Sequence, residues 1–179
     1  MTQIGNVYGE ALYDLARAEG LEAEILQQME ALEEGFRAEP DYLRLLAAPN
    51  LSKEERCGIV DDSFRDKVHP YILNFLKILC EKGYSRHFSD CFVSYREHYY
   101  LDHNILPVSA VTAVPLSEEQ NRKLTEKLVA ITGKTVLLTN RIEPGILGGI
   151  RLDYNGKRVD GTVSHRLEAV RSMLKNTVL

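Results

Sequence analysis

Apolar residues in the first part of the chain recur with helical spacing. In the first segment they occupy positions i, i+3, i+4, i+7, i+8 and i+11, which are Ile4, Val7, Tyr8, Ala11, Leu12 and Leu15. This spacing places them on one side of an α-helix. A second stripe runs from Leu21 to Phe36, and Gly20 fits the left-handed position that commonly ends a helix. The pattern predicts two helices before Pro40.

Start and stop signals predict four more helices before residue 105. Pro40 allows a short helix around residues 43–46, and the segment 52–55, Ser-Lys-Glu-Glu, is a capping box that opens the next helix. Pro70 suits the first turn of a fifth helix, and Gly83 suits its end. Aromatic residues at helical spacing between 88 and 99 indicate a long sixth helix. Short connections between six helices are typical of an antiparallel bundle.

The pattern changes after Asn104. Residues 108–114 and 135–139 read as strands, and Ser117 opens a helix between them with a second capping box. Residues 148–154 and 157–159 flank Asn155-Gly156, a strong hairpin signal. A last helix carries Val163, Leu167, Val170 and Leu174. We predict a mainly α chain, with an N-terminal six-helix antiparallel bundle at 1–105 and a small α/β domain at 106–179.

Charge differs between the two predicted domains. The chain has 179 residues and a net charge of −4, but residues 1–105 carry 11 Lys/Arg against 19 Asp/Glu, whereas 106–179 carry 11 against 7. An acidic helical half, at −8, is unlike a nucleic-acid-binding helical domain. No apolar run approaches the length of a membrane span, and the acidic start lacks the features of a signal peptide. We expect a cytoplasmic protein with no nucleic-acid partner.

No catalytic, cofactor-binding or metal-binding constellation is predicted. Gly133-Lys134-Thr135 resembles the end of a phosphate-binding loop, but Leu128 stands where the first glycine is needed, and the segment leads from a helix into a strand. The five histidines lack zinc-ligand spacing. Three cysteines without a CxxC pair indicate reduced, mostly buried thiols. The sequence therefore favours a non-enzymatic protein.

The predicted fifth helix is apolar almost all round. Its apolar residues are Tyr71, Ile72, Leu73, Phe75, Leu76, Ile78, Leu79 and Cys80. A helix packed on one side needs a single stripe. Either this helix is central to the bundle, or one face lines a groove for a partner helix. Both interpretations can hold together.

Two segments resemble the delta subunit family of the bacterial-type ATP synthase, whose mitochondrial relative is the oligomycin-sensitivity-conferring protein. Residues 7–16, Val-Tyr-Gly-Glu-Ala-Leu-Tyr-Asp-Leu-Ala, are similar to the family's opening helix, although Gly9 stands at a usual alanine. Residues 145–150, Gly-Ile-Leu-Gly-Gly-Ile, followed by 159–163, Val-Asp-Gly-Thr-Val, and Arg166-Leu167 resemble its C-terminal signature. His165 occupies a position where the family often has glycine.

The resemblance implies a non-catalytic stator subunit of a proton-translocating rotary ATP synthase, present in a single copy per complex. The helical domain would take the N-terminal helix of an alpha subunit into a groove between its first and fifth helices. The groove residues implied are Ile4, Tyr8, Ala11, Leu12, Leu15, Ile72, Phe75, Leu76 and Leu79. Some of them must belong to the core, and the sequence does not divide the two sets.

For the C-terminal domain, the resemblance implies binding to the b subunits of the peripheral stalk. The residues expected to contact the stalk are Arg166, Val170, Arg171, Met173 and Leu174. The protein would lie at the cytoplasmic side of the membrane as a peripheral subunit that meets the membrane only through the complex. The alternative is a helical adaptor or scaffold of another complex.

Overall fold

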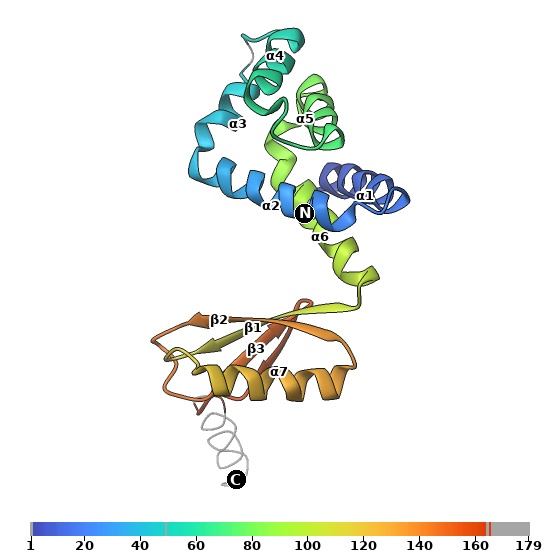
Figure 1. The fold of residues 1–179 in the computed structure, drawn as a ribbon. Coiled ribbons are helices and arrows are strands. Elements are labelled where there is room, and N and C mark those ends of the chain that lie inside the picture. The colour runs from blue at the N-terminus through green and yellow to red at the C-terminus, as the bar shows by residue number, and fades with distance from the viewer. Residues whose placement is uncertain (1, 49, 164, 166–179) are drawn as a thin grey trace, which may run out of the picture. The chain divides into compact units, whose positions relative to one another are not determined.

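The computed structural model describes residues 2–48, 50–163 and 165. It divides into two compact units, Met1–Tyr99 and Tyr100–Leu179 (Figure 1). The first unit is helical, and the second contains a four-stranded sheet and a helix. The prediction of a mainly helical chain with a small α/β part is confirmed.

Six α-helices lie before the first strand in the described part of the chain. They are α1 (Gln3–Ala18), α2 (Glu22–Ala38), α3 (Pro40–Leu46), α4 (Lys53–Phe64), α5 (Pro70–Lys82) and α6 (Phe88–Asp102). A single 3-10 turn at Ser85–His87 precedes α6. The six helices predicted before residue 105 therefore form, with ends close to the expected residues.

Capping side chains set several of these ends. The Ser52 hydroxyl accepts from the backbone N–H of Glu55 at 3.2 Å, and the Glu55 carboxylate accepts from the Ser52 N–H at 2.7 Å. Both halves of the predicted capping box are thus present. Gly83 ends α5 with φ +73°, a conformation that a glycine adopts without steric cost.

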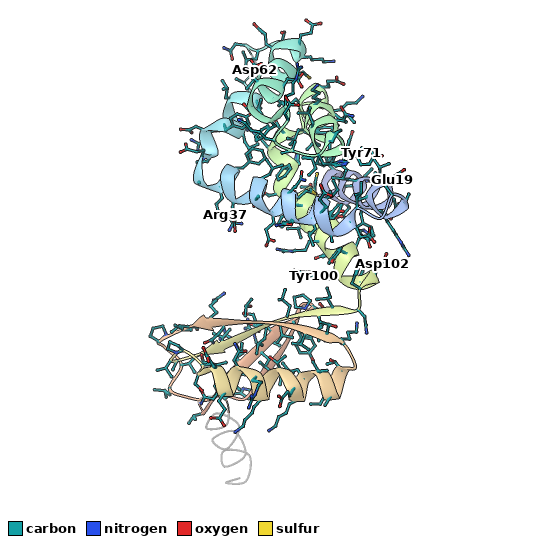
Figure 2. The ribbon with its side chains drawn as sticks, viewed as in Figure 1. Glu19, Arg37, Asp62, Tyr71, Tyr100 and Asp102 are labelled. Carbon is teal, nitrogen blue, oxygen red and sulfur yellow. The ribbon has the colours of Figure 1, made fainter. Side chains whose placement is uncertain are left out.

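The core of the helical unit contains large side chains from several helices (Figure 2). Ile25 and Met29 of α2 are fully buried, as are Ile72 of α5 and Phe88 and Tyr95 of α6. The Tyr95 hydroxyl donates to the Glu22 carbonyl at 3.0 Å, which satisfies a polar group that would otherwise be costly to bury.

Helices α1 and α6 approach closely where α1 carries two glycines. A Cβ added at Gly9 would lie 2.5 Å from the Cys91 carbonyl oxygen and 2.7 Å from the Ser94 Cβ. A Cβ at Gly5 would collide with Asp90. The crossing of α1 and α6 therefore depends on the absence of these two side chains.

The second unit is built on a sheet of order β2-β1-β3-β4. Its elements are β1 (Ile105–Thr112), α7 (Glu118–Thr132), β2 (Thr135–Ile142), β3 (Ile150–Tyr154) and β4 (Lys157–Asp160). Strand β1 pairs in parallel with β2 and antiparallel with β3, and β3 pairs antiparallel with β4. Helix α7 lies along one face of the sheet (Figure 1).

Strand β1 begins three residues before the predicted start at 108. Pro107 lies inside it, although proline cannot donate to a sheet ladder. The pairing with β3 covers only Ser109–Thr112 of β1, so Pro107 lies outside that ladder and its missing N–H breaks no bond there. The predicted Asn155-Gly156 turn is confirmed, with φ +45° and +72°. Apart from Val163 and His165, the last predicted helix lies outside the described residues.

Candidate partner-binding surfaces

Five of the nine residues expected to line a groove lie in the core of the helical unit. Their side chains are at most 6 % exposed, and they are Leu12, Ile72, Phe75, Leu76 and Leu79. The four residues of α5 form a regular stripe at i, i+3, i+4 and i+7, and this stripe faces inward. These side chains pack within the helical unit and leave little of their surface exposed.

The other four residues of the set reach the surface, all of them on α1. Ile4 and Tyr8 are half-buried, and Ala11 and Leu15 are exposed. Val7 belongs to the same side of the helix and is 57 % exposed. Together these residues form an apolar strip along α1 that is not covered by the described residues.

Helix α5 packs against α4, and in the view of Figure 1 it lies between α4 and α1. The Lys77 ammonium donates to the Asp61 carboxylate of α4 at 2.7 Å, and this hydrogen bond holds the pKa of Asp61 below its usual range. Ile78 follows Lys77 and is turned by about 100° around the helix. Ile78 is 43 % exposed.

A ring contact ties α1 to the end of α5. The Tyr8 and Tyr84 rings meet edge to face with centroids 5.9 Å apart, and Tyr84 directly follows Gly83. The α1–α5 face is defined here as Ile4, Val7, Tyr8, Ala11, Leu15 and Ile78.

The sequence reasoning did not choose Val7 and Ile78 for this face. Both residues are apolar, but the predicted set took the regular stripe of α5 without dividing core from groove, and that stripe is buried in the structure. A usable signal was available, because Ile78 is the apolar residue of α5 that falls outside that stripe near its C-terminal end. The α5 helix has a buried stripe and a separate exposed residue.

The glycine-rich signature in the second unit has a structural role. Gly149 has φ +87°, and a Cβ there would lie 2.6 Å from the Gly161 carbonyl oxygen. The Gly161 N–H donates to the Ile150 carbonyl at 3.0 Å, so the two segments cross in direct backbone contact. The Asp160 carboxylate accepts from the Thr162 N–H at 2.9 Å. Hydrogen bonding with the Thr162 side chain, and then with its backbone N–H, lowers the pKa of Asp160.

The remaining candidate chemistry is unremarkable within the described residues. They contain no group of three or more His, Cys, Asp or Glu side chains that could hold a metal ion. None of their helices is long and apolar enough to cross a membrane. Burial raises the pKa of the Cys80 thiol to about 11 and that of Cys91 to about 12, so both thiols are neutral near pH 7.

A family model described as the ATP synthase delta (OSCP) subunit matches residues 4–174. The chain belongs to the ATP synthase delta (OSCP) subunit family. Curated relatives named ATP synthase subunit delta span nearly its whole length. The one from Clostridioides difficile is 29% identical over 98% of this chain and 97% of its own. The one from Syntrophomonas wolfei is 31% identical over 94% and 92%.

The fold of this delta-family chain is also found in a solved structure. A chain of the mitochondrial ATP synthase hexamer of Toxoplasma gondii superposes with a TM-score of 0.75, at 15% identity, over 97% of this chain and 98% of that one. The likeness shows the fold of both units. The stalk-contact residues predicted for the family, Arg166, Val170, Arg171, Met173 and Leu174, lie outside the described residues.

Proposed function

We propose that this delta-family chain is a stator subunit that links the catalytic head of an F-type ATP synthase to its peripheral stalk. The helices α1–α6 act as one antiparallel bundle and bind the N-terminal helix of an alpha subunit. The observation that carries the proposal is the α1–α5 face, where Val7, Leu15 and Ile78 remain 43–57 % exposed on two neighbouring helices. A large apolar surface that the folded chain leaves open is typical of a protein-binding site.

An amphipathic helix is the partner that this face fits. Ala11 and Leu15 follow Val7 at intervals of four residues, so the apolar strip runs along α1 and matches the length of a bound helix. Ile78 supplies a contact from the neighbouring helix, and Tyr8 and Tyr84 contribute aromatic surface where the two helices meet.

The mechanical role sets the kind of interface required. A stator must stay attached while the rotor exerts torque, which requires slow dissociation, and differences in affinity between related interfaces lie mostly in the dissociation rate. Nanomolar binding corresponds to about 12 kcal/mol. Buried apolar and aromatic contacts supply such energy better than solvent-exposed ion pairs do.

Residues 1–105 and 106–179 act as separate domains in this proposal, and the second domain binds the b subunits through the helix predicted from its C-terminal sequence. Arg166, Val170, Arg171, Met173 and Leu174 remain the residues predicted to contact the stalk. The subunit is present once per complex, at the cytoplasmic side of the membrane. The family relationship supports this placement, because delta subunits are non-catalytic parts of the ATP synthase.

Calorimetric titration of the full chain with a peptide from the N-terminus of the cognate alpha subunit tests the proposal. We expect one-to-one binding with a negative heat-capacity change. The variant Ile78→Asp should abolish binding, because it places a charge in the apolar face while leaving the core intact. Leu45→Asp is the matched control, since Leu45 is 46 % exposed on α3, away from α1 and α5.

Equal affinity of the wild type and Ile78→Asp would contradict the placement of the partner on this face. Loss of binding in both variants would point to a general effect of the added charge. Phe75→Asp is unsuitable for this purpose, because Phe75 is 6 % exposed and a buried carboxylate would unfold the unit.

A further inference from the structure

The two edges of the four-stranded sheet differ in their protection. Strand β4 forms one edge with four residues, and three of them, Lys157, Arg158 and Asp160, are charged. Strand β2 forms the other edge with eight residues, has no proline, and carries a single charge at Arg141. Short, charged edges resist pairing with other chains, whereas long uncharged edges invite it.

The backbone of β2 presents a regular row of hydrogen-bonding groups at this edge. The Thr135 N–H donates to the Asn104 carbonyl, and the Glu143 N–H donates to the Thr112 carbonyl, so the odd-numbered residues face β1. In a parallel pair the intervening residues point their N–H and C=O groups the other way. These residues are Val136, Leu138, Asn140 and Ile142, and no described backbone group pairs with them on that side.

A hollow lies beside the same edge, on the face of the sheet that α7 covers. Its volume is about 440 Å³. It is lined by Leu138 of β2 and by Glu118, Asn121, Arg122, Thr125 and Glu126 of α7. Side chains of a strand added next to β2 would alternate between this hollow and the opposite face, where Leu137 is 46 % exposed and Arg141 is exposed.

We propose that the outer edge of β2 binds an extended segment of another polypeptide, which adds a fifth strand to the sheet. Small apolar side chains of the added strand enter the hollow beside Leu138, and a carboxylate on the other face pairs with Arg141, whose existing ion pair with Glu143 is long, at 3.8 Å, and exposed. This docking mode is strand addition, which differs from the helix binding proposed at the α1–α5 face and is independent of it. A second copy of β2 does not meet the requirement, because the segment 135–142 contains no acidic residue.

Residue-resolved amide exchange of the full chain tests strand addition directly. The ligand is an eight-residue peptide that alternates valine with glutamate, and the control peptide has lysine in place of glutamate. In the free chain we expect fast exchange at Val136, Leu138 and Ile142 and slow exchange at Leu137 and Thr139. The acidic peptide should slow exchange at the first set more than about tenfold, since hydrogen-bonded amides exchange only on opening.

A charge-reversed variant distinguishes the carboxylate contact from nonspecific peptide binding. Arg141→Glu should weaken the acidic peptide about fivefold at low salt and favour the lysine peptide by a similar factor. Slow amide exchange retained at Leu106 and Val108 of β1, which pair with β2 away from Arg141, confirms that the fold is intact. Equal binding of both peptides by both proteins would overturn the assignment of Arg141.

Three other outcomes would overturn the proposal itself. The outer amides could be unaffected by saturating acidic peptide. They could already be protected in dilute free chain, which would mean that the chain's own residues occupy the edge. Their protection could instead grow with protein concentration, which would identify a second copy as the occupant. None of these results affects the alpha-peptide titration, which reports on α1 and α5, so the two proposals fail separately.

Discussion

Replacing Gly9 with alanine tests how closely α1 and α6 pack. The added methyl group would lie 2.5 Å from the Cys91 carbonyl oxygen and 2.7 Å from the Ser94 Cβ, and neither atom belongs to a flexible side-chain end. The helices must therefore separate, and overpacking of this kind costs about 1–3 kcal/mol. Alanine also gains about 1 kcal/mol of helix propensity over glycine, which offsets part of that cost.

The net expectation for Gly9→Ala is a loss of about 1 kcal/mol, with about 2 kcal/mol as the upper end. For a helical unit of this size, each kcal/mol lowers the melting temperature by about 4–8 °C. Thermal unfolding of the full chain, followed by circular dichroism at the helical band, measures the change. The same substitution in α2 is the control, because nothing lies within 4 Å of a Cβ at Gly35.

Gly35→Ala should raise the melting temperature, since it gains helix propensity without a steric cost. Both variants replace a helical glycine with alanine, and they should shift stability in opposite directions. If Gly9→Ala stabilises the chain as much as Gly35→Ala does, the close crossing of α1 and α6 is wrong. A loss in both would mean that the gain in helix propensity does not stabilise this chain.

Two further predictions concern the ends of α1 and the buried thiols. Thr2→Ala removes the hydroxyl that caps α1 and donates to Asp90 at 2.7 Å, and should cost about 1–2 kcal/mol at pH 7 by urea titration. That bond lowers the pKa of Asp90, so its contribution to stability is present above about pH 4 and is lost as pH falls through the folded-state pKa. The difference in unfolding free energy between the wild type and Thr2→Ala should therefore narrow at low pH. A difference that does not change with pH would refute the link. A thiol reagent at pH 8 should modify Cys57 alone in the native chain, because burial keeps the Cys80 and Cys91 thiols protonated. Rapid modification of more than one thiol would contradict the burial of Cys80 and Cys91.

The helix ends were predictable because local chemistry decides them. The capping boxes at Ser52 and Ser117 and the left-handed glycine at Gly83 act through residues only a few positions away. The same holds for the Asn155-Gly156 turn, where positive φ is required at both positions. The family was also evident from the spacing of two short segments, and the comparisons confirm it.

The division between core and surface could not be obtained from the sequence, because it depends on which side of each helix its neighbours occupy. Phe75 and Ile78 are both apolar residues of α5, yet one is 6 % and the other 43 % exposed. Gly9 is a similar case. Its departure from the usual alanine had no evident reason until α6 was seen to leave no room for a methyl group. The stalk-contact residues stay a prediction.

The position of β1 in the sheet also bears on how the chain folds as it is synthesised. Strand β1 is the first strand in the sequence but occupies an interior place, paired with β2 some thirty residues later and with β3 later still. It cannot form its ladder until those residues have left the ribosome, whereas all six helices of the first unit precede it. Since domains generally fold as units from the N-terminus, the helical unit can finish folding before β2 and β3 are available to pair with β1.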